Sequence, residues 1–170
     1  RRIVSHGLAR VTGLHEAVLQ TGHVRRGSYL RAGETLELAS GLVEIRCYTG
    51  EQIIAHGPCK LSFTASAQGA THARVFLESG RLTARVPEQA VGFTVETPSA
   101  SVVDLGTEFG VLVRENNTEV HVISGKVRAK SVVAKSATEL VAGEAFQFQS
   151  DSAVPQRIEL AKAEFARELP

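Results

Sequence analysis

Residues 92–114, GFTVETPSASVVDLGTEFGVLVR, carry the strongest fold signal in the chain. Apolar and polar residues alternate before a Thr97-Pro98 break and again after a tight corner at residues 104–107. Such alternation predicts β-strands with one buried face. The stretch contains no metal-ligand set, no phosphate loop and no nucleophile of a recognisable kind. It therefore predicts a backbone-shaping motif and favours a binding or signalling module over an enzyme.

The same alternation continues on both sides of this stretch. Short apolar runs recur about every 8–12 residues and are bounded by Gly, Ser, Asn or Pro, the pattern of an all-β domain. The predicted strands are residues 8–11, 35–38, 42–48, 52–55, 60–65, 73–78, 82–86, 93–96, 101–104, 108–114, 119–123, 127–129, 139–141 and 145–149. We expect many short strands arranged in a solenoid-like roll or a β-sandwich.

One internal echo bears on this choice. Residues 74–85 and 119–130 both contain a strand pattern, then Ser-Gly, then a basic residue, an apolar residue and a later alanine. Two similar copies favour the stacked turns of a solenoid-like roll. Two hairpins built by the same turn chemistry explain the echo equally well.

Two segments have helical features. Residues 14–20 are short and read as a helix or a turn. In residues 156–169, Ile158, Ala161 and Phe165 share one face of a helix, and Pro155 stands at a favoured first-turn position. We therefore expect a C-terminal helix, or a linker to a following domain, over residues 155–170.

Composition excludes several classes of function. The chain has 170 residues, a net charge of +1, 43% hydrophobic residues and no tryptophan. These are globular values, and no basic run or basic-aromatic stripe indicates nucleic-acid binding. No run of about 18 apolar residues predicts a membrane span within the chain. The chain begins without methionine, so we expect any signal or membrane anchor to precede residue 1.

The residue types of catalytic and metal sites are present but scattered. The two cysteines, Cys47 and Cys59, are too few for a closed zinc site, and we favour two core thiols over one disulfide bridge. No Gly-x-Ser-x-Gly elbow or phosphate loop is present, so we expect no catalytic residues and no cofactor. We expect surface or hydrogen-bonded roles for the six histidines, which show no metal-ligand spacing: His6, His15, His23, His56, His72 and His121.

Asp104 is the polar residue of the corner that most needs an explanation. Its carboxylate is placed to accept backbone N–H bonds from the corner at Gly106 and Thr107, as aspartate often does in turns. A ligand or ion contact is the alternative. Gly106 suits a positive φ or a close backbone approach, and Phe109 suits the core.

The motifs together resemble the FecR domain family. The resemblance rests on Thr97-Pro98, on Asp104-Leu105-Gly106-Thr107-Glu108-Phe109 and on similar sequences around Gly125 and Gly143. It is specific over residues 72–149, looser back to residue 33, and hardly covers residues 1–32 and 155–170. The resemblance implies a FecR-like all-β domain over residues 1–154. It also implies structural roles for Thr97, Pro98, Asp104, Gly106, Thr107, Phe109, Gly125 and Gly143.

The resemblance further implies a function outside the cytoplasm. Well-known family members are anti-sigma regulators, anchored in the inner membrane, with this domain in the periplasm. They receive a signal from an outer-membrane transporter, in the regulation of iron transport, and control an extracytoplasmic-function sigma factor. The expected partner is a protein such as an outer-membrane receptor, with membrane contact only through an anchor outside this chain.

Two other functions stay open at the level of sequence. One is a structural or glycan-associated module in a cell-surface protein with a downstream laminin-G-like domain. The other is an enzyme with a dispersed site, which would need a deep pocket of convergent histidines and carboxylates.

Overall fold

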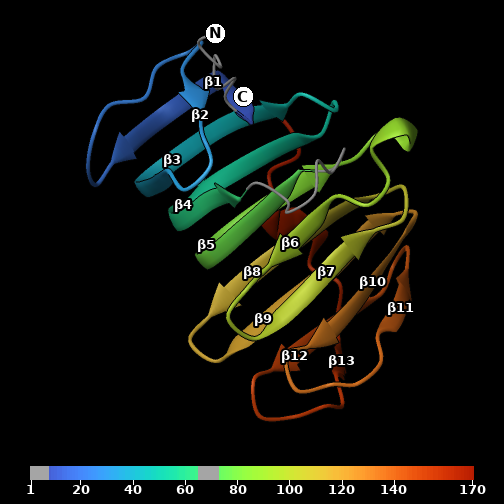
Figure 1. Ribbon diagram of the computed structural model, residues 1–170. Coiled ribbons are helices and arrows are strands. Elements are labelled where there is room, and N and C mark those ends of the chain that lie inside the picture. The colour runs from blue at the N-terminus through green and yellow to red at the C-terminus, as the bar shows by residue number, and fades with distance from the viewer. Residues whose placement is uncertain (1–7, 65–72) are drawn as a thin grey trace, which may run out of the picture.

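The computed structural model describes residues 8–64 and 73–170, which form a single 13-stranded sheet (Figure 1). His6 and His72 lie outside these ranges. The strands are β1 (Ala9–Leu19), β2 (Tyr29–Leu30), β3 (Thr35–Cys47), β4 (Gln52–Thr64), β5 (Arg74–Arg85), β6 (Thr94–Glu96), β7 (Ala100–Asp104), β8 (Glu108–Arg114), β9 (Asn117–Ser124), β10 (Lys126–Ser131), β11 (Thr138–Val141), β12 (Ala145–Gln149) and β13 (Gln156–Ile158). The prediction of an all-β fold is confirmed.

The sheet divides at β5 into two arms. The first half of β5 pairs with β6, and that arm continues through β7 and β10 to β11. The second half of β5 pairs with β8, and that arm continues through β9 and β12 to β13. Among the described strands, every pair is antiparallel except β5 with β6. Figure 1 shows the β8–β9 arm behind the β6–β7 arm.

The long strands bend in the middle, along a line that we call the crease. Register shifts mark it between Leu38 and Leu42 of β3 and between His56 and Lys60 of β4. Gly41 and Gly80 have positive φ angles, and a Cβ on either would collide with the backbone of the neighbouring strand. Only glycine fits both the conformation and the contact, so the sequence fixes where the sheet folds over.

The crease folds the sheet into two layers around one core. On one side of the crease, segments of β3, β4 and β5 continue into the β8 arm and form layer A. On the other side, the remaining segments of these strands continue into the β6 arm and form layer B. Hydrogen bonds between the hydroxyl of Thr118 on β9 and those of Thr97 and Ser99 link the layers across the interior. Fully buried side chains from both layers, including Phe63, Phe93, Phe109 and Phe148, form a single hydrophobic cluster.

Three strand pairs that the sequence predicts are single bent strands. Ser40-Gly41 and Ser79-Gly80 have turn composition, yet they lie inside β3 and β5, and Gly57-Pro58 lies inside β4. The glycines bend the strand without reversing it, because the ladder to the neighbouring strand resumes after each bend.

Both helix predictions are wrong. Residues 14–20 belong largely to β1. Residues 156–169 contain β13 and one 3-10 turn, η2 (Lys162–Glu164), rather than an α-helix; a second turn, η1 (Glu88–Ala90), precedes β6. The C-terminal segment is extended because its apolar residues Phe165 and Leu169 pack on two separate glycines of the sheet, Gly110 and Gly13. None of the helical turns in the described residues has the length or hydropathy of a membrane span.

Candidate functional site

Asp104 closes the corner between β7 and β8. Its Oδ2 accepts the backbone N–H of Gly106 at 2.9 Å, and its Oδ1 accepts the Thr107 hydroxyl. The Asp104 side chain is fully buried. Burial raises the pKa of this carboxyl, the two hydrogen bonds oppose that rise, and the charge of Glu51 adds to it. All described hydrogen-bond partners of the Asp104 carboxylate therefore belong to the corner itself.

A cluster of three hydroxyls holds the Thr97-Pro98 break. The Thr118 hydroxyl lies 2.6 Å from the hydroxyls of both Thr97 and Ser99, and all three residues are buried. Thr97 Oγ1 also accepts the backbone N–H of Ala100 at 2.9 Å. Pro98 is exposed at the tip of this turn. The break therefore ties layer B to layer A.

The remaining motif residues also serve the backbone and the core. Phe109 is fully buried and pairs with Ala84 and Val122 in the ladder. Gly125, at φ 74°, turns the chain from β9 in layer A to β10 in layer B, and a Cβ there would strike the carbonyl oxygen of Gly106. Gly143, at φ 89°, lies in the β11–β12 turn and donates its N–H to Val122 O at 2.9 Å.

A groove of about 520 Å³ lies on the outside of the crease. We call it the crease groove. Backbone of β4 and β5 at the bend contributes to its lining. Its polar side chains are one amide, one carboxylate and four basic groups: Gln20, Glu37, His56, Lys60, Arg81 and Arg114. The groove comes from strands that are far apart in the sequence, so sequence patterns alone do not reveal it.

Arg81 and His56 are cross-strand neighbours at the edge of this groove. Burial, and then the charge of Arg81, lower the pKa of His56, so its imidazole is neutral at neutral pH. Nδ1 of His56 and Nε of Arg81 are buried and find no hydrogen-bond partner among the described residues. Lys60 pairs with Glu78 at 3.3 Å.

The C-terminal tail, residues 159–170, crosses the outer face of layer A next to the groove. The Ala161 N–H donates to Nδ1 of His121 on β9 at 3.1 Å. The Phe165 ring covers Gly110 of β8, and Leu169 reaches Gly13 of β1. In Figure 1 the tail passes behind the sheet, and the C-terminus lies beside β1. The tail therefore runs across the strands instead of joining them.

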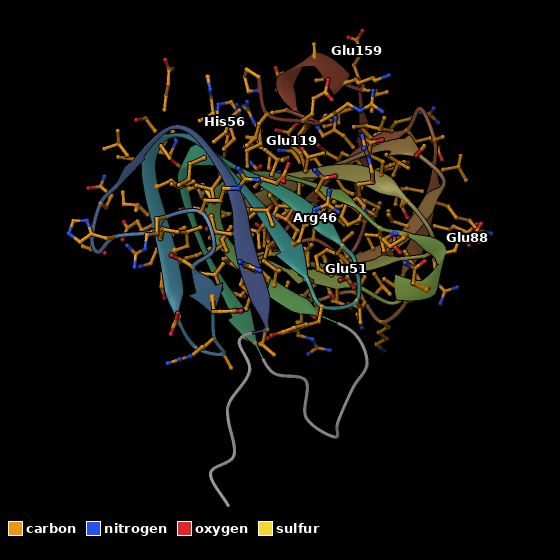
Figure 2. All side chains as sticks on the ribbon, turned by 90° about the horizontal axis from the view of Figure 1, so that it is seen from above. Arg46, Glu51, His56, Glu88, Glu119 and Glu159 are labelled. Carbon is orange, nitrogen blue, oxygen red and sulfur yellow. The ribbon has the colours of Figure 1, made fainter. Side chains whose placement is uncertain are left out.

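The outer face beneath the tail is unusually buried. Ile54, Thr83 and Leu112 alternate with core residues along their strands, yet they are only 2%, 4% and 5% exposed. Arg81 lies over the Phe165 ring at 5.7 Å and donates from Nη1 to the Glu164 carbonyl oxygen at 2.8 Å. Arg81 thus belongs to both the tail contact and the crease groove. Figure 2 shows His56, Glu119 and Glu159 on this side of the molecule.

An ion pair fixes the end of the tail. Arg167 donates from Nη2 to Glu108 Oε2 at 2.8 Å and from Nε to Oε1 of the same carboxylate. These hydrogen bonds, together with the charges of Arg85 and Arg167, lower the pKa of Glu108 against the opposing effect of its burial. The arrangement is a bidentate arginine–carboxylate pair, the geometry that contributes most among surface ion pairs.

The residues that metal or thiol chemistry would use remain apart. Cys47 and Cys59 are free and buried; burial raises the pKa of Cys59 to about 12 and that of Cys47 further, with a contribution from Glu51. Within residues 8–64 and 73–170, no three side chains of His, Cys, Asp or Glu gather as metal ligands. Of the described histidines, only His56 lines the crease groove, and His121 lies under the tail.

The motif and the exposed groove are therefore different parts of the molecule. The motif residues Thr97, Asp104 and Phe109 are buried, whereas Arg81, Arg114 and Lys60 line an open surface. Neither the groove nor the tail contact follows from the sequence patterns. The available signals were Gly110 and Gly13, which interrupt otherwise regular strands, and such glycines often mark close approach by another chain segment.

The FecR protein family model matches residues 57–128, from the crease in β4 into β10. The predicted resemblance to this family is confirmed for that segment, which includes the corner at Asp104. It also includes most of the residues that line the crease groove. No curated protein matches the chain.

Two crystal structures from Parabacteroides distasonis ATCC 8503, each described as a "putative anti-sigma factor", are similar to this chain. The first has a TM-score of 0.55 at 18% identity, and the second a TM-score of 0.47 at 19% identity. Each match covers 77% of this chain and 58% of the other. At such low identity the first match establishes a shared fold. The chain corresponds to little more than half of that crystallised protein.

Proposed function

We propose that this FecR-matching chain is a non-catalytic regulatory domain that senses a signal by binding another protein outside the cytoplasm. The observation that carries the proposal is the FecR match over residues 57–128. The shared fold with a protein described as an anti-sigma factor supports the same role.

The distribution of polar residues is consistent with binding rather than catalysis. The side chains of Asp104 and of the Thr97–Ser99–Thr118 cluster form hydrogen bonds with the backbone and with neighbouring side chains of the fold. The crease groove, in contrast, is an open surface lined by polar side chains such as Lys60, Arg81 and Arg114. A domain of this kind recognises its partner through a surface that a rigid frame holds in place.

The proposed location is the periplasm, with an anchor to the inner membrane elsewhere in the protein. The proposed partner is an outer-membrane receptor or another envelope protein. Binding would be relayed through the anchor to an extracytoplasmic-function sigma factor. This location and this relay extend the FecR match by analogy with well-known family members.

A deletion in the native host tests the regulatory role. We expect loss of the gene to change the expression of a coherent set of genes that one extracytoplasmic-function sigma factor controls. Full-length protein should restore the pattern. Protease treatment of intact spheroplasts should digest the domain, because it would lie outside the inner membrane.

Either of two results would count against the proposal. One is an unchanged transcript profile under conditions in which the gene is expressed. The other is a domain that resists protease until the inner membrane is broken. Retention of the domain by cell-wall glycans, with no effect on transcription, would favour the structural or glycan-associated alternative.

A further inference from the structure

We propose that the crease groove binds an acidic segment of a partner protein, with carboxylates received between Arg81 and Arg114. This inference rests on the proposed protein-binding function and names the surface and the chemistry that carry it. The groove is lined mostly by residues of the FecR-matching segment; Gln20, Glu37, Leu38 and His56 come from outside that segment.

The charge of the groove is the first argument. Lys60, Arg81 and Arg114 line it, against the single acidic residue Glu37. Glu78 neutralises Lys60. Arg114 makes no ion pair with any residue in ranges 8–64 and 73–170, and its side chain is exposed. The whole chain carries only +1, so this positive surface is a local feature and selects a negatively charged occupant.

The shape of the groove is the second argument. About 520 Å³ accommodates a few side chains of a peptide and exceeds what a single small anion needs. Backbone at the bends of β4 and β5 contributes to the lining, and Gly57 and Gly80 lie there close against the backbone of the neighbouring strands. A site with a fixed wall loses little conformational entropy when it binds.

The position of Arg81 is the third argument. The tail holds its guanidinium over the Phe165 ring and fixes Nη1 on the Glu164 carbonyl oxygen. An arginine held in this way at the edge of a groove is prepared for a carboxylate, because its side-chain freedom is already lost. We infer that Phe165 acts as a positioning residue for the groove.

The unpartnered atoms at the groove are the fourth argument. Nδ1 of His56 and Nε of Arg81 are both buried without a hydrogen bond among the described residues. Native proteins rarely leave such atoms unsatisfied, and those that persist call for an explanation in function or strain. Two of them on neighbouring residues of one groove are consistent with a surface that is kept for binding.

Titration of the purified full chain with a hexaglutamate peptide at low salt tests this proposal. Binding is followed by calorimetry and by NMR shifts. Hexaglutamine is the uncharged control, and inorganic phosphate separates a peptide site from a general anion site. Arg114→Gln removes one proposed contact without touching the tail. Arg128→Gln is the matched control, because Arg128 is an exposed arginine on layer B.

We expect hexaglutamate to shift residues around the groove and Arg114→Gln to weaken its binding about tenfold, the usual loss of one charge-assisted hydrogen bond. Arg128→Gln should bind like the wild type, and both variants should keep the wild-type melting temperature. Phe165→Ala should also weaken binding, and Phe165→Leu should restore part of it. Equal affinity of the Arg114→Gln and Arg128→Gln variants would overturn the proposal, as would shifts confined to other surfaces or tighter binding of phosphate.

The two proposals fail in different ways. If hexaglutamate does not bind while the gene deletion still changes transcription, the regulatory role stands and the groove is not its binding surface. If the deletion has no effect while the Arg114→Gln variant loses the peptide, the acidic-segment site stands without the regulatory role.

Discussion

The two faces of β8 differ in how their side chains are used. The inward residues Phe109, Val111 and Val113 belong to the core between the two layers. The outward residues Gly110 and Leu112 are also buried, and Gly110 is covered by Phe165 of a tail that comes from some 50 residues further along the chain. One face is buried by the sheet's own folding, and the other is buried only while the tail is docked.

This difference separates the frame from the surface that can change. Core residues respond only to global unfolding, whereas a docked segment can open locally at a smaller free-energy cost. Arg81 stands at the boundary, since its backbone lies in the sheet and its guanidinium contacts the tail and the groove. A change in tail docking would therefore reach the groove without any change in the core.

Removing one phenylalanine from each face should give the largest effects and test the comparison directly. Phe109→Ala should lower the free energy of unfolding by about 4 kcal/mol, the usual cost of emptying a buried phenylalanine site. Phe165→Ala should cost about 3 kcal/mol or less, because the loss cannot exceed the free energy of tail docking. Urea denaturation measures both.

Hydrogen exchange distinguishes the mechanisms behind these two losses. In Phe165→Ala, amides of the tail should exchange faster while those of β3 and β4 keep their protection. In Phe109→Ala, protection should fall throughout the sheet. A uniform fall in both variants would show that the tail is part of the core and would remove the distinction between the two faces.

Asp104→Ala tests the frame at a fully buried carboxylate. The change leaves the N–H of Gly106 and the hydroxyl of Thr107 without their acceptor, and we expect a loss of about 2 kcal/mol. Asp151→Ala, in an exposed turn, is the control and should stay within about 0.5 kcal/mol of the wild type. If Asp104→Ala melted like the wild type, a ligand-binding role for this residue would regain support.

The frame could be predicted from the sequence because its signals are local. Apolar residues at alternate positions, such as Phe93 and Val95 or Phe109 and Val111, predict strands with a buried face from only a few neighbouring residues. The Asp104 corner uses partners two and three residues away, within reach of turn chemistry.

The outer face could not be predicted because its contacts are distant in sequence. Phe165 packs on Gly110, and Leu169 packs on Gly13, but no sequence periodicity links either residue to its partner. The same apolar residues fit a helical pattern, which explains the wrong helix prediction over residues 156–169. The bends at Gly41 and Gly80 have the sequence signature of turns, because a glycine that bends a strand and one that ends it look alike in the sequence.

Gly110→Ala should lower the free energy of unfolding by a smaller amount, and only through the contact between the tail and the outer face. The new methyl group would meet the Phe165 ring and force it to move, so we expect a loss of about 1.5 kcal/mol. In the Phe165→Ala background the same change should cost less than about 0.5 kcal/mol, since nothing opposes the methyl group. A thermodynamic cycle from four denaturation curves measures this coupling, and strict additivity would contradict the packing of Phe165 on Gly110.

The smallest effect should come from the Arg167–Glu108 pair, and its pH dependence identifies it. Because hydrogen bonds from Arg167 lower the pKa of Glu108 in the folded state, the pair stabilises the fold above the unfolded pKa of the carboxyl. That stability is lost as the pH falls through the lower, folded pKa. Arg167→Gln should cost about 0.5 kcal/mol at pH 7, since Arg167 is partly exposed. The difference from the wild type should vanish at acidic pH, where Glu108 is protonated in both proteins.

Arg157→Gln, which removes an exposed contact with Glu144, is the control and should change stability less at every pH. A difference between the Arg167→Gln variant and the wild type that persisted unchanged at acidic pH would mean that Arg167 acts through packing, and tail docking would then depend on Phe165 and Leu169 rather than on charge.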